Sequence, residues 1–385
     1  MPWEETCSMN ERIRLIALWN EGKMSVSELG RAFGISRKTV YKWVARYAEH
    51  GASGLEDRTT VAHHHPHATA EALVSALVEL RKERPTWGPK KLRARLAELG
   101  TAPPAASTIG ELLKKHGLIR PRRRRVYPPR MPGELAQTTQ PNDTWCADFK
   151  GHFALGDKSR CHPLTITDQV SRYLLKCESV ERPDTAHAKV HFERAFREYG
   201  LPLRIRSDNG PPFATAGIGG LSELSVWWMK LGIQPERIEP GHPEQNGRHE
   251  RMHRTLGEET ARPPRHNAIE QQLVFDCFRG DYNNVRPHEA LGQTPPSSHY
   301  TASTRSMPEV LKSPEYPEGV KVRRLDEQGR MKLQGSKNKT TISRLLKNEP
   351  VGLLEREDGF QLFYGNVLLA NLSLRNKDVR IERVK

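Results

Sequence analysis

A segment rich in proline and arginine places the strongest constraint on how this chain of 385 residues can fold. Residues 121–132 read PRRRRVYPPRMP. Proline has no amide hydrogen to donate, and its ring clashes with the preceding turn, so this run cannot form a regular helix. We therefore expect residues 121–137 to be a basic linker between separately folded parts, and the chain length suggests about two to four domains.

Charge is distributed unevenly along the chain. The sequence holds 61 Lys and Arg against 46 Asp and Glu, a formal net charge of +15. Residues 1–130 carry +11, residues 131–300 carry −2 and residues 301–385 carry +6. A near-neutral middle flanked by basic ends favours an anionic partner that contacts mainly the two ends.

Other classes of protein are disfavoured. No run of about 18 apolar residues occurs, so we expect no membrane span, and the segment MPWEETCSMNER lacks the form of a secretory signal. The five cysteines are odd in number, widely spread and without a CxxC pair. This pattern argues against a disulfide framework or a cysteine-rich zinc site, and it suits a reducing cytosol.

Residues 1–60 have the pattern of a helix-turn-helix DNA-binding domain. Ser25 to Glu28 has the form of a capping box, Gly34 supplies a turn and Ser36 can cap the next helix. That helix has an inward apolar stripe and an outer polar cluster. The outer cluster, predicted to contact DNA, consists of Arg37, Lys38, Tyr41 and Lys42. The alternative is a solvated basic helix on a small bundle.

Residues 68–120 are predicted to form a second helix-turn-helix-like domain. Three apolar stripes at helical spacing indicate three helices, and the second stripe consists of Leu92, Leu96 and Leu99. Trp87 to Pro89 resembles a turn into the helix that carries the predicted DNA contacts Lys90 and Lys91. A plain three-helix connector is the alternative. The linker contains four consecutive arginines, Arg122, Arg123, Arg124 and Arg125. We expect this run to lie along DNA phosphates, and the alternative is a solvated linker. The histidines at 63–67 lack partners at ligand spacing and are taken as loop residues.

Residues 138–300 indicate an α/β layered domain. Strands are predicted at 144–153, 162–168, 172–177 and 203–206, helices at 184–199, at 221–231 and from about 246 onward, and an extended segment at 234–239. Three antiparallel strands followed by a helix, a strand and further helices are typical of the ribonuclease-H-like type.

Three acids stand out by position in this domain. Asp148 lies within the first strand, Asp208 just after the fourth, and Glu250 one turn into the late helix. Carboxylates from distant segments can hold hard divalent cations, Mg²⁺ above all, and two ions about 3.5–4 Å apart can assist phosphoryl transfer. Without a cation, neighbouring carboxylates repel one another. Taken singly, each acid is an ordinary solvated or capping residue.

Five motifs in order resemble the transposases of insertion sequences in the retroviral-integrase superfamily, namely WCADFKG, TDQVSRYLL, SDNGPPF, GHPEQNGRHERMHRTL and YNNVRPHEALGQTPPS. The resemblance covers nearly the whole chain. It implies nicking at element ends followed by strand transfer into target DNA, carried out by a metal-binding Asp-Asp-Glu triad. Asp148 in WCADFKG and Asp208 in SDNG match the first two members.

The third member has two candidates. Glu244 follows Asp208 after 35 intervening residues, the spacing common in the superfamily, whereas Glu250 follows after 41. The motif favours Glu250, because the family's acid comes three residues after the Gly of an N-G or Q-G pair, here Asn246-Gly247. We expect residues 214–224 to hold the extra length as a surface loop.

Neighbouring motif residues complete the predicted site. The residues predicted to line its DNA-facing side are Asn209, His242, Asn246 and Arg248. Asp168 is interpreted as a turn acid that stabilises Ser171 or Arg172. The residues predicted to brace the last core helix are Asn283, Arg286, Pro287 and His288.

Residues 318–385 are predicted to form a small all-β domain. Five or six short strand-like segments separated by turns follow Val320, which suggests an SH3-like barrel. Its positive charge suits contact with the DNA backbone, and a role in oligomerisation remains equally open.

The sequence as a whole predicts a multidomain DNA transposase. The implied cofactor is Mg²⁺ or Mn²⁺, as two ions, and the implied partner is double-stranded DNA at element ends and target sites. Joining two ends requires at least two protomers, so we expect a homo-oligomer on DNA, in the bacterial cytoplasm. Two alternatives stay open. One is a catalytically silent DNA-binding regulator derived from a transposase; the other, a simple ribonuclease-H-like nuclease, does not explain the N-terminal helical blocks.

Overall fold

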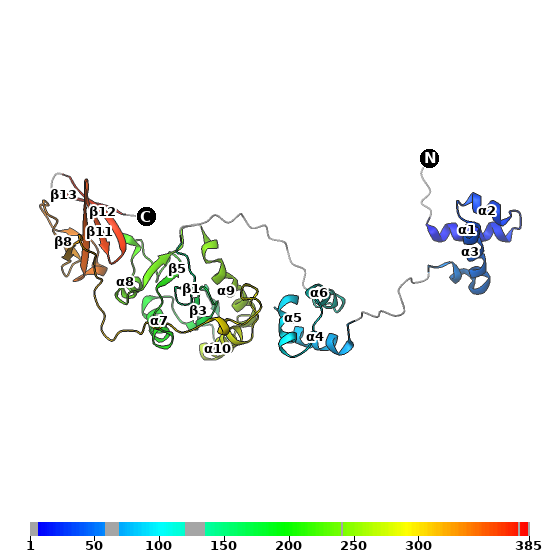
Figure 1. Cartoon of the computed structure of the whole chain (residues 1–385), viewed down its shortest axis with the longest axis horizontal. Coiled ribbons are helices and arrows are strands. Elements are labelled where there is room, and N and C mark those ends of the chain that lie inside the picture. The colour runs from blue at the N-terminus through cyan, green and yellow to red at the C-terminus, as the bar shows by residue number, and fades with distance from the viewer. Residues whose placement is uncertain (1–6, 58–68, 120–134, 240–241, 376–377, 384–385) are drawn as a thin grey trace. The chain divides into compact units, whose positions relative to one another are not determined.

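The computed structural model describes residues 7–57, 69–119, 135–239, 242–375 and 378–383, without the side chains of a few residues, among them Glu244. The arginine run at 122–125 and the histidines at 63–67 lie outside these ranges. The chain divides into two compact units, residues 1–68 and residues 69–385, and each is described by itself (Figure 1).

The described part of the first unit is a small helical bundle. Its helices are α1 (Ser8–Asn20), α2 (Val26–Ala32) and α3 (Arg37–His50), followed by the 3-10 turn η1 (Gly51–Leu55). The predicted capping box is confirmed: the Ser25 amide donates to the Glu28 carboxylate at 2.7 Å, and the Glu28 amide donates to the Ser25 hydroxyl at 3.4 Å. Gly34 has a φ of +63°, which allows the tight turn before α3. The helix-turn-helix prediction is confirmed in these elements.

The second unit begins with a helical block, residues 69–119. Its helices are α4 (Glu71–Glu83), α5 (Pro89–Glu98) and α6 (Ala106–Lys115). They pack around Trp87, which is 1% exposed, together with Leu92, Leu96 and Ile109. One member of the predicted stripes was wrong: Leu99 is 60% exposed, because α5 ends at Glu98 and Leu99 is already its C-cap.

A mixed sheet forms the centre of the second unit. Its strands are β1 (Thr144–Phe149), β2 (Phe153–Ala154), β3 (Arg160–Asp168), β4 (Leu174–Val180), β5 (Arg204–Ser207) and β6 (Gln234–Arg237). The strand order is β2-β3-β1-β5-β6, and β4 pairs with β3. As predicted, β1, β3 and β4 are antiparallel neighbours, whereas β5 runs parallel to β1, and β6 runs parallel to β5. This is the arrangement expected of a ribonuclease-H-like core.

Helices cover both faces of this sheet. They are α7 (Thr185–Tyr199), α8 (Glu223–Lys230), α9 (Gly247–Thr260) and α10 (Ala268–Asn284), with the 3-10 turns η2 (Ile218–Gly220), η3 (Pro243–Asn246), η4 (Glu289–Leu291) and η5 (Pro296–His299). Side chains of β4 pack into both layers: Leu175 packs with α7 and α8, and Leu174 and Cys177 pack with α9 and α10. The domain therefore has an α/β/α layering, with α9 on the face opposite α7 and α8.

The C-terminal part is all-β in its regular structure, apart from the 3-10 turn η6 (Arg344–Leu346). Its strands are β7 (Lys321–Arg324), β8 (Arg330–Met331), β9 (Thr340–Thr341), β10 (Pro350–Arg356), β11 (Gly359–Tyr364), β12 (Val367–Arg375) and β13 (Asp378–Arg383). Five of them form an antiparallel sheet in the order β13-β12-β11-β10-β7, and β8 pairs with β9. The all-β prediction is confirmed, although the sequence did not indicate β13.

The predicted surface loop at residues 214–224 is not a surface loop. Ile218 is 7% exposed and Leu221 is 3% exposed, and both belong to one apolar cluster with Leu369 of the C-terminal sheet. Val226 and Met229 of α8 join the same cluster. This stretch therefore forms a seat for the C-terminal sheet, and the burial of its apolar side chains stabilises the contact.

This seat predicts a specific loss of stability. We expect Leu221→Ala to lower the free energy of unfolding by about 2–4 kcal/mol, since it leaves a cavity in a closed apolar cluster. Hydrogen exchange followed by mass spectrometry should show faster exchange of the β12 amides in this variant. The matched control is Leu203→Ala, at a position 46% exposed. Equal exchange of β12 in both variants would contradict the assignment.

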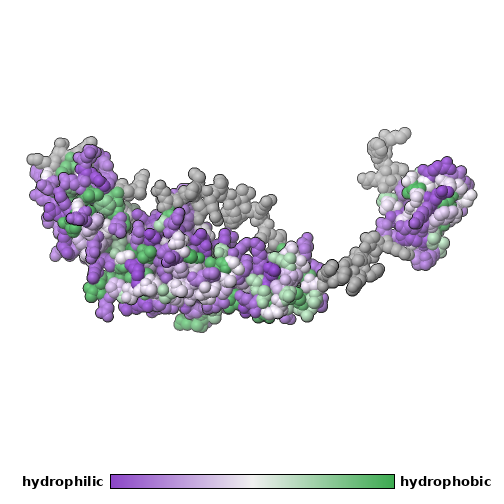
Figure 2. Space-filling view, in the orientation of Figure 1, coloured by the Kyte–Doolittle hydropathy of each residue, from purple (hydrophilic) through white to green (hydrophobic). Residues whose placement is uncertain are grey.

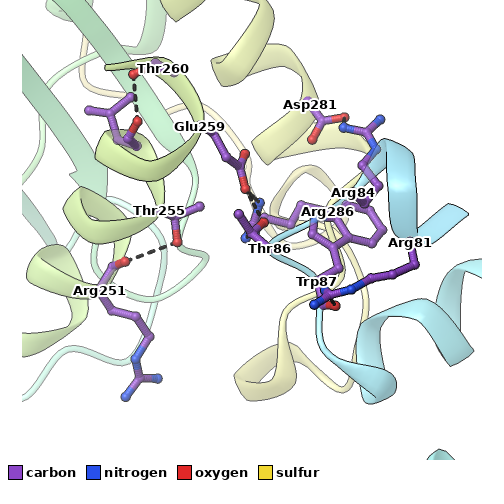
Figure 3. Close-up of polar contacts among 11 residues, drawn as sticks. Arg81, Arg84, Thr86, Trp87, Arg251, Thr255, Glu259, Thr260, Asp281 and Arg286 are labelled. Atoms are coloured by element: carbon purple, nitrogen blue, oxygen red, sulfur yellow. Dashed lines mark hydrogen bonds and ion pairs between the residues drawn. The ribbon is translucent and has the colours of Figure 1, made fainter. Parts of the chain in front are cut away.

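The helical block contacts the far ends of α9 and α10 through a polar junction (Figure 3). Arg84 pairs with Asp281 at 2.7 Å, and Glu259 at the end of α9 pairs with Arg286 at 2.7 Å and accepts a hydrogen bond from Thr86. The guanidinium groups of Arg84 and Arg286 also lie 5.2 and 5.9 Å from the centre of the Trp87 ring. The block is thus attached to the same helix that carries Glu250.

Hydrophilic side chains cover most of the surface visible in Figure 2. In the ranges that the structure describes, we find no helix long and apolar enough to cross a membrane.

Candidate active site

Strand pairing brings the first two acids to one edge of the sheet. β1 and β5 are parallel neighbours in which Cys146 is level with Arg206. Asp148 and Asp208 each follow two residues later, so both carboxylates stand at the carboxyl end of adjacent parallel strands. Both side chains are only half-buried, which leaves them open to a ligand.

Glu250 is exposed and lies in the first turn of α9. The pKa of Asp148 reflects the nearness of the other acids. Burial, the charge of Asp208 and the charge of Glu250 together raise this pKa to about 7. Burial also raises the pKa of Asp208. All three acids are therefore within electrostatic reach of one another.

These residues fit a hard divalent cation. They supply oxygen ligands from three separate elements, which is the donor set that Mg²⁺ and Mn²⁺ prefer. Within the described ranges, no Lys or Arg forms an ion pair with Asp148, Asp208 or Glu250. Burial is the main cause of the raised pKa of Asp148, and a cation bound among the three acids would relieve the repulsion that adds to it.

Two histidines that the sequence interpretation missed lie beside Asp148. His249 and His253 are 2% and 8% exposed and face the sheet from α9. The His253 Nδ1 atom lies 3.8 Å from the Asp148 Oδ2 atom. The available signal was their i, i+4 spacing on the helix face that also carries Leu256.

Asp148, His249 and His253 each offer a ligand atom, and these atoms lie within 4.8 Å of one another. Both ring nitrogens of His249 are nevertheless within hydrogen-bond distance of threonine hydroxyls, at 2.7 Å from Thr165 and 2.8 Å from Thr167. A buried imidazole with both nitrogens bonded has no lone pair left for a metal. His249 thus has a structural role next to the carboxylate site, whereas the His253 Nδ1 atom faces the Asp148 carboxylate.

The predicted DNA-facing residues are distributed around this edge. Asn209 is exposed, and its amide donates to the Ile238 carbonyl at 2.6 Å. Arg248 is exposed, and its guanidinium donates to the Gln169 carbonyl at 3.3 Å, while His242 is half-buried with its imidazole 3.7 Å from Glu239. Asn246 differs, because it is 5% exposed and its Oδ1 atom has no hydrogen-bond partner among the described residues.

Two supporting predictions are seen in the hydrogen bonds. Asp168 accepts hydrogen bonds from the Ser171 amide at 2.7 Å and the Ser171 hydroxyl at 2.6 Å, so it is a turn acid as interpreted. Asn283 joins α10 to β4, accepting from the Leu174 amide at 2.8 Å and donating to the Leu174 carbonyl at 3.0 Å. With the Arg286 pair to Glu259, these bonds brace the ends of α9 and α10.

The predicted DNA-binding residues of the two helical parts differ in setting. All four outer residues of α3 are exposed, namely Arg37, Lys38, Tyr41 and Lys42. In the second block, Lys90 pairs with Glu289 of the core, and Lys91 is half-buried. Burial, with the charge of Arg286, lowers the pKa of Lys91 to about 8.

Known families match most of the chain in segments. Residues 138–243 and residues 231–296 each match a family described as "Integrase core domain". Residues 11–60 match "Helix-turn-helix domain", and residues 39–113 match "Homeodomain-like domain". Residues 138–296 thus match integrase core families, and residues 11–113 match helix-turn-helix and homeodomain-like families.

Two of the named relatives come from insertion elements. The chain is 29% identical over 229 residues to the "Insertion element IS407 uncharacterized 31.7 kDa protein" of Burkholderia multivorans, covering 59% of this chain and 80% of that protein. It is 28% identical over 238 residues to the "Insertion element IS476 uncharacterized 39.2 kDa protein" of Xanthomonas euvesicatoria, covering 60% of this chain and 65% of that protein. A solved structure of the HTLV-2 integrase catalytic core domain in complex with magnesium is a distant likeness, with 16% identity and a TM-score of 0.34 over 43% of this chain and 100% of that one.

Proposed function

We propose that the protein is a DNA transposase that nicks the ends of an insertion element and transfers the freed strand into target DNA. The proposal is carried by one observation: Asp148 and Asp208 stand at the carboxyl ends of the adjacent parallel strands β1 and β5, and the charge of Glu250, in the first turn of α9, acts on Asp148. Three acids so arranged on β1, after β5 and on α9 suit one or two divalent cations. The likeness to insertion-element proteins supports the same reading.

In this proposal the three carboxylates hold Mg²⁺ or Mn²⁺, which when bound supplies Lewis-acid stabilisation and activates the attacking oxygen. The protein contributes the placement of the ligands. β1 and the end of β5 carry Asp148 and Asp208 at one edge of the sheet, and the first turn of α9 carries Glu250, whose charge acts on Asp148. Asn209 and Arg248, both exposed nearby, would contact the DNA backbone.

End recognition falls to α3 of the first unit. Its exposed residues at the N-terminal turns occupy the positions from which a recognition helix meets base edges. We expect the double variant Arg37→Ala/Lys38→Ala to weaken binding to element ends by about 10- to 100-fold at fixed salt. Fluorescence anisotropy with labelled end DNA measures this, and Lys23→Ala, an exposed lysine outside α3, is the matched control. An equal loss in both variants would mean that α3 has no special part in binding.

The proposed activity is tested with purified protein, labelled DNA ends from the flanking sequence of its own gene, and Mg²⁺ or Mn²⁺. Joined products that disappear with EDTA are the expected result. Binding to the ends without cleavage would instead support a silent regulator, and degradation without joining would support a simple nuclease. Because two ends must be held together, we also expect the active complex to contain at least two protomers.

The second block and the C-terminal sheet are assigned supporting roles. Lys90 and Lys91 remain proposed DNA contacts, although in this structure they lie beside the core acids Glu289 and Glu259. The SH3-like character of the C-terminal sheet also remains a proposal. Lys321 to Arg324 on its edge strand β7 are all exposed, which favours contact with the DNA backbone.

A further inference from the structure

A buried polar seam joins α9 to the sheet beside the three acids. On the helix side lie His249 and His253, and on the strand side lie Thr165 and Thr167 of β3, which are 0% and 6% exposed. Most helix–sheet contacts in this core are apolar, as at Met252 and Leu256 of the same helix. Polar groups at a buried contact are costly unless each is hydrogen-bonded, so their presence here calls for a specific role.

Thr165 lies at the centre of this seam. Its hydroxyl lies 2.7 Å from His249 Nε2, 2.6 Å from His253 Nε2 and 3.2 Å from the backbone carbonyl oxygen of Asp148. Thr165 is also the residue directly opposite Asp148 in the pairing of β1 with β3. One hydroxyl thus touches the strand that carries Asp148 and, through two imidazoles, the helix that carries Glu250.

A single arrangement of protons satisfies every contact of the Thr165 hydroxyl. The Asp148 carbonyl can only accept, so the one Thr165 proton goes to it, and both imidazoles then donate to Thr165 from Nε2. His249 Nδ1 is left as an acceptor, and the Thr167 hydroxyl donates to it at 2.8 Å. Both imidazoles are neutral in this arrangement.

The directionality of these bonds fixes the position of α9 along and around its axis. An apolar contact tolerates small sliding, whereas two imidazole hydrogen bonds to one oxygen do not. His249 immediately precedes Glu250, so fixing its ring also fixes the backbone from which the Glu250 side chain extends. His253 places its ring edge beside the Asp148 carboxylate.

We propose that Thr165 is a positioning residue of the metal site, which sets Glu250 on α9 relative to Asp148 on β1 through His249 and His253. This inference rests on the proposed function, because it assumes that the acids bind a divalent cation. It assigns to Thr165, His249 and His253 a role in cation affinity. Support residues behind metal ligands typically change that affinity by about 10- to 100-fold.

The test measures the binding of Mn²⁺ to the full-length protein without DNA. Binding is detected as the loss of the electron paramagnetic resonance signal of free Mn²⁺. Thr165→Val keeps the shape but loses the hydroxyl, and we expect its Mn²⁺ Kd to rise about 10- to 100-fold. Thr165→Ser restores the hydroxyl and should return the Kd to within about threefold of the natural protein. The matched control is Thr167→Val, which removes a hydroxyl from the same seam without touching His253 or Asp148, and should also stay within about threefold.

The outcomes separate this inference from the proposed function. If Asp148→Asn binds Mn²⁺ as tightly as the natural protein, the proposed metal site itself is wrong. If Asp148→Asn loses binding while a folded Thr165→Val keeps it, or if Thr165→Val and Thr167→Val weaken binding equally, the positioning role is wrong. Should Thr165→Val fail to fold, His253→Gln and His253→Leu make the same comparison, because Gln keeps a donor near the Nε2 position and Leu does not. We expect the Mn²⁺ Kd to rise for His253→Leu but not for His253→Gln. Equal Kd values for these two variants would overturn the inference.

Discussion

Glu250→Gln is expected to abolish strand transfer, with a loss of at least about 1,000-fold, whereas Glu244→Gln should remain within about threefold of the natural protein. The glutamine keeps the shape of the side chain but loses the charge that lies within electrostatic reach of Asp148. Metal-ion catalysis contributes several kcal/mol to the stabilisation of a phosphoryl-transfer transition state, and each 1.4 kcal/mol corresponds to about tenfold in rate.

The measurement is the rate of joining of labelled element ends under single-turnover conditions with Mg²⁺. End binding by each variant serves as the control, because α3 lies in the other unit of the chain and should be unaffected. The two glutamates are six positions apart, and either one fits some version of the family spacing. The reverse result, with Glu244→Gln inactive and Glu250→Gln active, would mean that the third ligand is misassigned.

The second large effect is a gain in stability. Asp148→Asn should stabilise the metal-free protein by about 2 kcal/mol near pH 8, because the folded protein no longer holds a half-buried carboxylate next to two others. Active sites commonly sacrifice stability in this way.

The sign of the pH dependence follows from the pKa of Asp148, which is about 7 in the folded protein against an ordinary value of 3.8. Between these values the folded state binds more protons than the unfolded state, so the natural protein loses stability as the pH rises through this window. An asparagine at this position would not titrate, so the Asp148→Asn variant lacks this loss of stability. Thermal unfolding in EDTA should therefore give similar melting temperatures near pH 4 and a higher one for Asp148→Asn near pH 8. A variant that is less stable at both pH values would contradict this account.

Much of the fold could be predicted because its signals are local. The capping box at Ser25, the positive-φ turn at Gly34 and the alternation of Trp145 and Ala147 depend on a few neighbouring residues, and the structure has each of them. The two aspartates could also be placed, since parallel strands that are neighbours end at the same edge.

What the sequence could not indicate depends on contacts between distant segments. Residues 214–224 look like a glycine-rich loop, and only the C-terminal sheet, more than 100 positions later, explains why Ile218 and Leu221 are buried. His249 and His253 read as polar residues on a basic helix, and their partner Thr165 lies 84 and 88 positions away. Leu99 was assigned to a core because helical spacing does not show where α5 ends.

The central claim is that Asp148, Asp208 and Glu250 together bind the divalent cations used in strand transfer. The most direct measurement is an anomalous difference map from crystals of the protein soaked in Mn²⁺. The account predicts Mn²⁺ peaks within about 2.5 Å of carboxylate oxygens from all three residues. A peak on the imidazoles of His249 and His253, on Glu244 in place of Glu250, or on none of the three acids would contradict it.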